Sequence, residues 1–455
     1  MNEICLYNRK IIKKTKNDKI ISLAFFLLTM AFFIYDYVFT INVYNDALVN
    51  ILFFLIGFIS IIGMCLFPNF ISVIKMLFSF NFVFFYYTAF KQYSSHSNLW
   101  NHVIFDDNDY LKANLMIIAS IFLVIFVYIN CFKKKKMEDK KNKNYSYTKC
   151  SYILITIINL MILFYFFLAN GIISREGEAA DTIFSSIQKI IRFFPVCSII
   201  AYYNDKIVNK KKSNRLFFLT NILIVLILYF PFAGSISRFL LFGAYFCLIA
   251  KPIQNIKIQS LLPFICLFSL CAIFPLFNFF KYNTIFDISN FNYENYSFNY
   301  NSVDFDAYQM LLEAIKFTDA TEIKYGSNII TSILFFIPRS IWKSKMELSG
   351  AIIANYYGAA FTNLSCPYVA EFYVAFGSFG VMFFSVLLGI IIKKLDNWFS
   401  GYSIKKIGYS SIALGISIYW FRGSMLPTNA YLFALLISYF LLLFVLNITR
   451  KIKIK

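Results

Sequence analysis

Long apolar stretches separated by short polar segments make up most of this chain. Twelve of them predict membrane-spanning helices, since a helix needs about 20 predominantly apolar residues to cross a bilayer. They are residues 20–39, 48–67, 70–90, 111–132, 150–169, 183–203, 216–232, 236–250, 261–280, 369–392, 407–421 and 431–448. The pattern therefore predicts an all-α fold, a polytopic integral membrane protein with about 12 transmembrane helices.

Composition agrees with a membrane protein and argues against a separate soluble domain. Of the 455 residues, 59% are hydrophobic and only 15% are charged, which is too apolar for a disordered chain or an ordinary soluble enzyme. The nine cysteines lie mostly within the apolar stretches, so neither a disulfide framework nor a CxxC metal site is predicted. The basic N-terminus precedes an apolar run too long for a signal peptide, and we expect an uncleaved first helix.

The distribution of basic residues sets the expected orientation. With the N-terminus inside, 30 of the 43 Lys and Arg residues fall on the cytoplasmic side and 11 on the other, while Lys189 and Arg192 lie within a span. This bias follows the positive-inside rule, so the net charge of +20 does not indicate nucleic-acid binding. Both termini are expected in the cytoplasm.

One segment between the predicted spans is much longer than the others. Residues 281–366 are expected to form a loop on the outer side of the membrane. Residues 1–280 contain helices 1 to 9 and residues 367–455 contain helices 10 to 12, and we expect all of them to form a single membrane domain. After an Asn- and Tyr-rich patch at 290–301, this loop shows helical periodicity at 307–317, 327–337 and 351–361. Long loops are often functional, and we expect short helices lying over the membrane mouth.

Arginine departs from the charge pattern that lysine follows. Arg175, Arg192, Arg238, Arg339 and Arg422 lie on the outer side or within a span, whereas most lysines are cytoplasmic. Because the guanidinium fork binds phosphate in a bidentate way that lysine does not reproduce, these positions predict an extracytoplasmic anionic ligand, and a lipid pyrophosphate fits. We expect Arg192, Arg238, Arg339 and Arg422 to line one cavity.

Burial of Arg192 costs the most free energy among the five arginines, because its position in the span puts it about 10 Å or more below the outer surface. Lys189 lies one turn above it on the same face. The alternative is a structural ion pair with a buried carboxylate such as Asp36 or Glu371.

Arg238 follows a short turn at the start of a helix, where anions bind. For Arg238 and for Arg422, the alternative is that the side chain snorkels to lipid headgroups.

Arg339 belongs to a basic cluster in the long loop. Lys343 and Lys345 add positive charge, and Trp342 offers a flat face for a sugar ring or for the membrane interface. Arg175 is flanked by acidic residues, so a local ion pair is its alternative.

A reaction in which a hydroxyl attacks uses a base on that hydroxyl, and Glu371 is the best-placed acid, at the outer mouth of the tenth span. Further candidates, expected to be exposed, are Asp304, Asp306, Glu313, Glu322 and Glu347.

The sequences IPRSIWKSK, EFYVAFGSFGVMFFSVLLG and FRG, within residues 327–424, resemble the second half of bacterial oligosaccharide repeat unit polymerases, the Wzy-type O-antigen and capsule polymerases. Arg339 and Gly350 reproduce an Arg-x10-Gly spacing of some members, while the proline that many members have near Lys345 is absent. The resemblance implies polymerisation of undecaprenyl-pyrophosphate-linked oligosaccharides on the outer face of the bacterial inner membrane. A chain-length regulator is a further partner that such an activity would allow. The only histidines, His96 and His102, lie in one loop without a partnering Cys group, so we expect neither a metal nor a cofactor.

Two other functions fit the same layout. A lipid-linked oligosaccharide flippase is the non-enzyme alternative, although flippases generally lack so long an outer loop. An O-antigen ligase, or another lipid-sugar glycosyltransferase, is the nearest enzyme alternative. Ligases use a histidine in their large outer loop, and residues 281–366 contain none.

Overall fold

The computed structural model describes residues 16–42, 45–67, 69–100, 103–131, 147–169, 183–209, 214–229, 238–280, 283 and 285–452. Over these residues the chain is helical and has no strand. Within the described ranges, seven helices are long and apolar enough to cross a membrane: Asn17–Thr40, Ala47–Leu66, Val73–Ser94, Asp107–Asn130, Lys149–Leu168, Tyr368–Phe399 and Met425–Arg450. An all-helical membrane protein is thus confirmed, while the number of twelve spans stays a prediction.

Every apolar stretch of the sequence contains a helix. The first part of the chain forms α2 (Lys16–Thr40), α3 (Ala47–Leu66), α4 (Val73–Phe80), the π-helical η1 (Asn81–Tyr87), α5 (Thr88–Ser94), α6 (Asp107–Asn130) and α7 (Lys149–Ala169). It continues with α8 (Ile183–Asn209), α9 (Arg215–Leu228), α10 (Arg238–Ile253), α11 (Leu261–Phe268), the π-helical η3 (Ser269–Ile273) and α12 (Phe274–Phe279). The last helices are α17 (Tyr368–Phe399), α18 (Ile404–Arg422) and α19 (Met425–Ile452).

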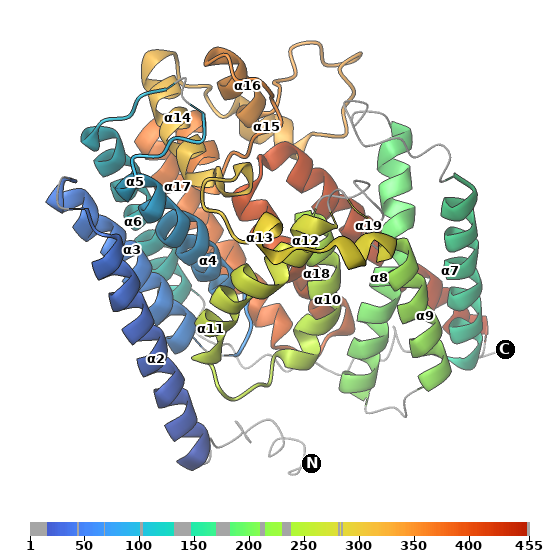
Figure 1. Cartoon of the computed structure of the whole chain (residues 1–455). Coiled ribbons are helices and arrows are strands. Elements are labelled where there is room, and N and C mark those ends of the chain that lie inside the picture. Colours follow the sequence, from blue (N-terminus) through green and yellow to red (C-terminus); the bar gives the residue numbers. More distant parts are fainter. Residues whose placement is uncertain are drawn as a thin grey trace.

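The segment between α12 and α17 is folded into short helices. They are the 3-10 helices η4 (Ile285–Asn290) and η5 (Val303–Phe305) and the α-helices α13 (Tyr293–Tyr296), α14 (Ala307–Ala320), α15 (Ser327–Ile333) and α16 (Ser349–Tyr356). Figure 1 shows α14, α15 and α16 together at the top of the bundle, over the upper ends of the long helices. We call residues 285–366 the cap and this end of the molecule the capped end.

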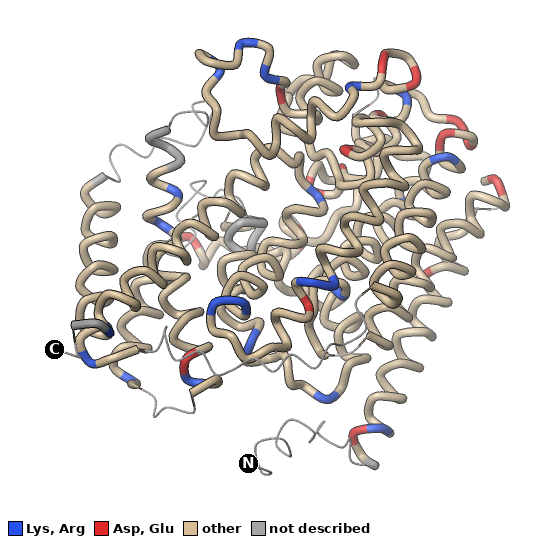
Figure 2. Tube along the Cα trace, turned by 180° about the vertical axis from the view of Figure 1, so that it is seen from behind, with Lys and Arg blue, Asp and Glu red and all other residues tan. Residues whose placement is uncertain are grey.

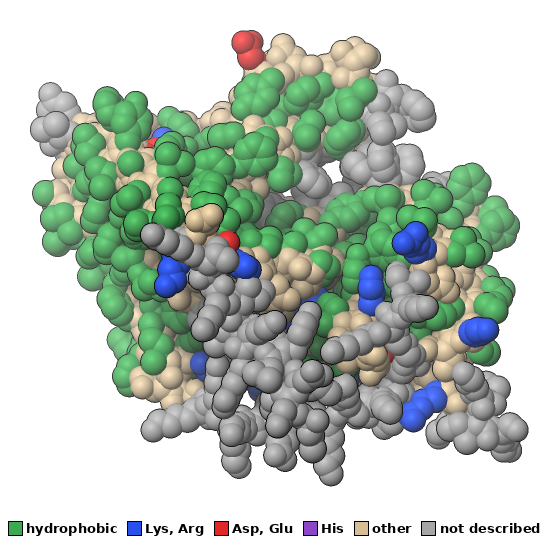
Figure 3. All heavy atoms as spheres, turned by 90° about the horizontal axis from the view of Figure 1, so that it is seen from below, with side chains coloured by type: hydrophobic (Ala, Val, Ile, Leu, Met, Phe, Trp, Pro, Cys, Tyr) green, Lys and Arg blue, Asp and Glu red, His purple; other side chains and the backbone are tan. Residues whose placement is uncertain are grey.

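The buried apolar residues form two clusters. One cluster includes residues of α3, α4, α5, α6, α14 and α17, and the other includes residues of α7, α8, α9 and α19. Residues of α18 belong to both clusters. Long apolar side chains on the outward faces of α2 and α7 remain exposed, as a lipid-facing surface requires. In the view from below, hydrophobic side chains cover much of the periphery (Figure 3).

Charge differs between the two ends of the bundle. Figure 2 shows acidic residues gathered at the capped end and mainly Lys and Arg toward the opposite end. This asymmetry agrees with the pattern from which the orientation was predicted, and the orientation itself stays a prediction.

Close helix contacts depend on small residues. A Cβ on Gly415 of α18 would lie 2.0 Å from the Cys247 Sγ and 2.7 Å from the Gly243 carbonyl oxygen, both on α10. The absence of a side chain thus lets the α10 and α18 backbones approach, which is common where helices pack inside membranes.

α17 contains a break in its helical backbone eight residues from its start. Phe376 has φ −149° and ψ 28°, and Gly377 has φ 60° and ψ −147°, a conformation essentially restricted to glycine. Before the break the helix is buried, whereas Phe379 soon after it is 68% exposed. The break therefore divides a protein-enclosed part of α17 from a part with exposed apolar side chains.

The segment before α15 hydrogen-bonds to the backbone of α17 just before this break. The Lys324 N–H donates to the Val374 carbonyl and the Gly326 N–H donates to the Ala375 carbonyl, each at 3.1 Å. A break in a membrane helix is tolerated where other groups form hydrogen bonds with the backbone groups that the break leaves unpaired. The cap and α17 are thus joined through main-chain hydrogen bonds.

Candidate functional site

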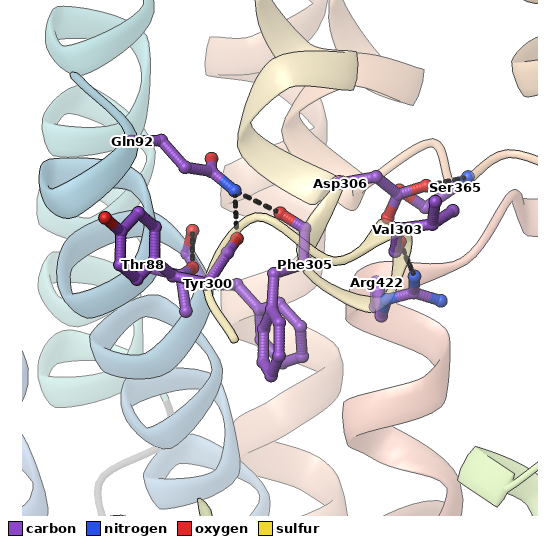
Figure 4. A network of polar contacts seen from close by, with 9 residues as sticks. Thr88, Gln92, Tyr300, Val303, Phe305, Asp306, Ser365 and Arg422 are labelled. Carbon is purple, nitrogen blue, oxygen red and sulfur yellow. Dashed lines mark hydrogen bonds and ion pairs between the residues drawn. The ribbon is translucent and has the colours of Figure 1, made fainter. Parts of the chain in front are cut away.

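Arg422, the last residue of α18, pairs with a buried carboxylate of the cap. Its Nη2 lies 2.7 Å from Asp306 Oδ1, and the Arg422 and Asp306 side chains are 14% and 1% exposed. Asp306 Oδ2 accepts from the Ser365 N–H at 2.9 Å, and Oδ1 accepts from the Ser365 hydroxyl at 2.7 Å. Arg422 Nη2 also donates to the Val303 carbonyl at 3.3 Å. Figure 4 shows these groups converging beside the end of α18.

The Glu371 side chain, which projects from α17, fixes the start of α19. It is 1% exposed, and its Oε1 accepts a hydrogen bond from the Met425 N–H at 2.8 Å. Its Oε2 accepts from the Ser349 hydroxyl at 2.7 Å and from Asn328 Nδ2 at 2.9 Å. One carboxylate thus joins α15, α16, α17 and α19. It lies enclosed by these donors, so its predicted role as a catalytic base stays a prediction.

Gly350 explains how α16 comes close to the segment before α17 and to the turn between α18 and α19. A Cβ at this position would lie 2.5 Å from the Leu364 carbonyl oxygen and 2.9 Å from that of Ser365. The Gly350 N–H donates to the Ser424 hydroxyl at 3.3 Å. The glycine of the Arg-x10-Gly spacing therefore has a packing reason in this chain.

The segment that leads into α14 is held between α5 and α18. Gln92 Nε2 on α5 donates to the carbonyls of Tyr300 and Phe305, at 2.7 and 3.2 Å, while Arg422 reaches the Val303 carbonyl (Figure 4). The Asp306 side chain therefore projects from a segment fixed at both of its sides.

A second set of cations lies on α8. The Lys189 Nζ is 4.7 Å from the centre of the Tyr431 ring on α19. Tyr431 lies six residues after Met425, where α19 begins at the capped end. A helix rises about 1.5 Å per residue, so the Tyr431 backbone lies roughly 9 Å along α19 from its first residue, and the half-buried Lys189 side chain reaches the Tyr431 ring.

Arg192 lies one turn further along α8 and is surrounded by aromatic rings. Its Cζ is 5.6 Å from the Phe166 ring centre and 5.5 Å from that of Tyr229. Its Nη2 donates to the Leu228 carbonyl at 3.1 Å, while its Nε is buried without a hydrogen-bond partner among the described residues. The α8 cations are thus stabilised by ring faces and a carbonyl, which are weaker partners for a cation than a carboxylate.

The structural ion pair proposed as an alternative for Arg192 is not formed with either predicted carboxylate. Asp36 instead pairs with Lys91 at 2.8 Å, and Glu371 binds Ser349, Asn328 and Met425. In the parts of the chain that the structure describes, neither Lys189 nor Arg192 has a carboxylate within ion-pair distance.

The basic cluster of the long loop forms a turn between α15 and α16. Arg339 is exposed and its Nη1 donates to the Lys345 carbonyl at 3.1 Å. The Lys345 side chain is 3% exposed, and its Nζ donates to the carbonyls of Phe335 and Ile337. Lys345 therefore stabilises the turn, in a position removed from solvent. Lys343 is exposed and Trp342 is half-buried, with its Nε1 donating to the Ser344 hydroxyl.

Two predicted site residues are described only partly or not at all. Arg238 is the first residue of α10, and its side chain lies outside the described residues. Arg175 lies wholly outside them.

Two loop acids that the sequence suggested as exposed are buried. Asp306 is 1% exposed because it pairs with Arg422, and Glu313 of α14 is 0% exposed. Trp100 Nε1 and Gln309 Nε2 donate to Glu313 Oε1. Burial raises the pKa of Glu313 to about 7, with a further rise from the charge on Asp306, against the lowering effect of these two donors. In contrast, Glu322 and Glu347 are exposed as expected.

The structure brings Arg422 and Glu371 to the same turn, whereas the contacts of Arg192 and Arg339 place these two arginines elsewhere. Arg192 contacts α7 and α9, and Arg339 contacts its own turn. The prediction that four arginines line one cavity therefore gains no support from these contacts.

Sequence reasoning missed the role of Ser349 and Ser365 as hydrogen-bond donors to carboxylates. A serine between the predicted spans carries no signal of the carboxylate that it contacts in the folded protein.

Comparisons with known proteins give no relative. No family model, no curated protein and no solved structure matches this chain.

Proposed function

We propose that the protein polymerises oligosaccharide repeat units linked to a lipid diphosphate, undecaprenyl pyrophosphate, at the outer face of a bacterial inner membrane. The capped end would face outward, since it lies opposite the end richer in Lys and Arg. Support comes from the helical membrane body, from the folded segment over one end, and from the sequence resemblance to repeat unit polymerases.

The observation that carries the proposal is the cation pair on α8. Lys189 and Arg192 have aromatic and carbonyl partners and no carboxylate partner among the described residues. Two positive charges among the helices of a membrane protein are costly unless an anion balances them. A lipid diphosphate supplies two negative phosphates on an apolar chain, which suits a cation pair flanked by aromatic rings.

The chemistry needs charge stabilisation at the leaving group. In the reaction, an acceptor hydroxyl oxygen forms a bond to the anomeric carbon of the donor, the bond from that carbon to the phosphate oxygen breaks, and the lipid diphosphate leaves with the bonding electron pair. The hydroxyl proton passes to a base or to water. A fixed guanidinium stabilises the negative charge that develops on the phosphate oxygen, and its effect is larger where water is excluded.

Reconstitution tests the proposal. Purified protein in liposomes is given undecaprenyl-diphosphate-linked repeat units, and products are resolved by chain length. Wild-type protein should produce a ladder of polymers. Arg192→Gln should slow polymerisation about 100-fold, Lys189→Gln less, and Arg192→Lys should leave an intermediate rate because charge is kept and the fork is lost.

Lys206→Gln is the matched control, because it removes one positive charge from an exposed position near the other end of α8. It should leave the ladder unchanged. If wild-type protein polymerises and the α8 variants match this control, the diphosphate role of α8 is wrong. If wild-type protein yields no polymer, the proposed activity is wrong.

A deletion strain separates the alternatives. Loss of a polymerase should leave lipid cores with one repeat unit. Loss of a ligase should leave polymer on its carrier, and loss of a flippase should leave neither product at the surface.

A further inference from the structure

The Arg192 guanidinium is bound by the carboxyl-terminal end of a neighbouring helix. α9 ends at Leu228, and the carbonyls in the last turn of a helix have no N–H partner within that helix. The Leu228 carbonyl accepts from Arg192 Nη2 at 3.1 Å. Because the helix dipole places partial negative charge at this end, α9 offers the cation a counter-charge that is weaker than a carboxylate.

Tyr229, the residue that follows α9, contacts both the side chain and the backbone of Arg192. Its ring centre lies 5.5 Å from Arg192 Cζ, where the ring face attracts a cation. Its hydroxyl donates to the Arg192 backbone carbonyl at 3.1 Å. One side chain therefore restrains the guanidinium and the backbone that carries it.

Tyr229 is itself held in place from three directions. Its N–H donates to the Val225 carbonyl of α9 at 2.9 Å, and its carbonyl accepts from the Tyr245 hydroxyl of α10 at 3.0 Å. Its ring stacks on Phe193 of α8, with ring centres 6.0 Å apart. Tyr229 is 0% exposed, so any effect that it has on a bound ligand passes through its neighbours.

The backbone of α8 is weakened close to Arg192. Pro195 lies inside this helix and has no N–H to donate to the carbonyl of Ile191, four residues before it. The ladder of backbone hydrogen bonds is thus interrupted in the turn that contains Arg192. The Tyr229 hydroxyl binds the next carbonyl, that of Arg192, from outside the helix.

We infer that Tyr229 is a positioning residue that holds the Arg192 guanidinium in the orientation that binds the lipid diphosphate, an inference that rests on the proposed function. Tyr229 acts through Arg192 and does not touch the donor. The end of α9 thereby belongs to the donor site, although it supplies no charged side chain to it.

Two substitutions of Tyr229 test the inference in the same liposome assay. Tyr229→Leu removes the ring and the hydroxyl, and it should lower kcat about 100-fold, as expected when a catalytic group is displaced. Tyr229→Phe keeps the ring beside the guanidinium and removes one hydrogen bond, so it should lower kcat less than about tenfold.

Tyr147→Leu is the matched control. Tyr147 is also buried, and its hydroxyl also donates to a backbone carbonyl of α8, that of Ser198, at 2.8 Å. This carbonyl lies six residues beyond Arg192. Tyr147→Leu should therefore lower the melting temperature and leave kcat per folded molecule at the wild-type value.

Combination with Arg192→Gln separates positioning from structural support. If Tyr229 acts through Arg192, Tyr229→Leu should slow the wild-type protein and should not slow Arg192→Gln further. A purely structural loss would lower the melting temperature in both backgrounds and leave kcat per folded molecule unchanged in each. That result, or an equal slowing of both backgrounds, overturns the inference.

Tyr229→Phe keeps the test open if Tyr229→Leu fails to fold. Its smaller rate loss should be present in the wild-type background and absent with Arg192→Gln. A loss that is missing from the first background or persists in the second also overturns the inference. Absence of polymer from wild-type protein would instead refute the proposed function.

Discussion

The Glu371 carboxylate accepts a hydrogen bond from the backbone N–H of Met425, at 2.8 Å, and so fixes the start of α19 to the buried half of α17. Ser349 and Asn328 donate to the other oxygen of the same carboxylate. This single side chain therefore holds the cap and two long helices together.

Removing this carboxylate should destabilise the fold. Glu371→Ala takes the side-chain acceptor from the Met425 N–H and the Ser349 hydroxyl and leaves Asn328 Nδ2 with only its bond to the residue 371 carbonyl, so we expect a loss of about 3 kcal/mol or more in the free energy of unfolding. Glu371→Gln, which keeps one accepting oxygen, should lose less. Thermal unfolding in detergent measures both. Glu322→Gln, at an exposed acid of the same cap, is the control; a Glu371→Ala melting temperature equal to that of the control would refute the structural role.

The break in α17 should depend on glycine. Gly377 has φ 60° and ψ −147°, and a Cβ there would meet only Ile323, at 3.7 Å, so the cost of Gly377→Ala is backbone strain of about 1–3 kcal/mol. Gly358→Ala is the matched control, since Gly358 also has a positive φ of 67° and open space at its Cβ position. Amide exchange across residues 321–328 should rise in the Gly377 variant only; equal exchange in the two variants would count against coupling of this segment to the break.

Glu313 should make stability depend on pH. Its pKa in the folded protein is about 7, against 4.5 for an ordinary glutamate. Because the folded state binds the proton more tightly, the stabilising contribution is complete below pH 4.5 and is lost as pH rises to about 7, by roughly 3 kcal/mol.

Glu313→Gln should remove this dependence, because the amide stays neutral. Melting temperatures between pH 5 and 8 should therefore fall less in the variant than in wild-type protein, and the variant should be the more stable of the two at pH 8. Glu347→Gln, at an exposed site, should keep the wild-type slope. Parallel pH curves for wild-type protein and Glu313→Gln would contradict the prediction.

The contact between α10 and α18 should not tolerate a side chain at Gly415. Because its added Cβ would lie 2.0 Å from Cys247 Sγ, Gly415→Ala should cost more than about 2 kcal/mol through separation of the helices. Gly243→Ala probes the same contact from α10, where the nearest atom would be 3.1 Å away, and should cost less. Yield and melting temperature in detergent rank the two variants, and the reverse order would contradict this packing.

The sequence by itself determined the helices and their lipid-facing character. Apolar runs such as those of α3 and α6 predict helices because backbone groups in lipid must bond within their own segment, and these helices occur where the hydrophobic pattern placed them. Periodicity also located α14, which was expected at 307–317 and spans Ala307–Ala320. Local patterns suffice for such elements because the interactions that form a helix are local.

Only the tertiary structure decided which charges are neutralised. Arg422 and Arg192 look alike in sequence, yet Arg422 meets Asp306 from 116 residues away while Arg192 meets ring faces and a carbonyl. Likewise, Asp306 and Glu313 read as exposed loop acids, and long-range packing buries both. The energy of a charge depends on its solvent exposure and on the neighbours that folding brings close. Neither quantity can be predicted from the residues that adjoin the charge in sequence.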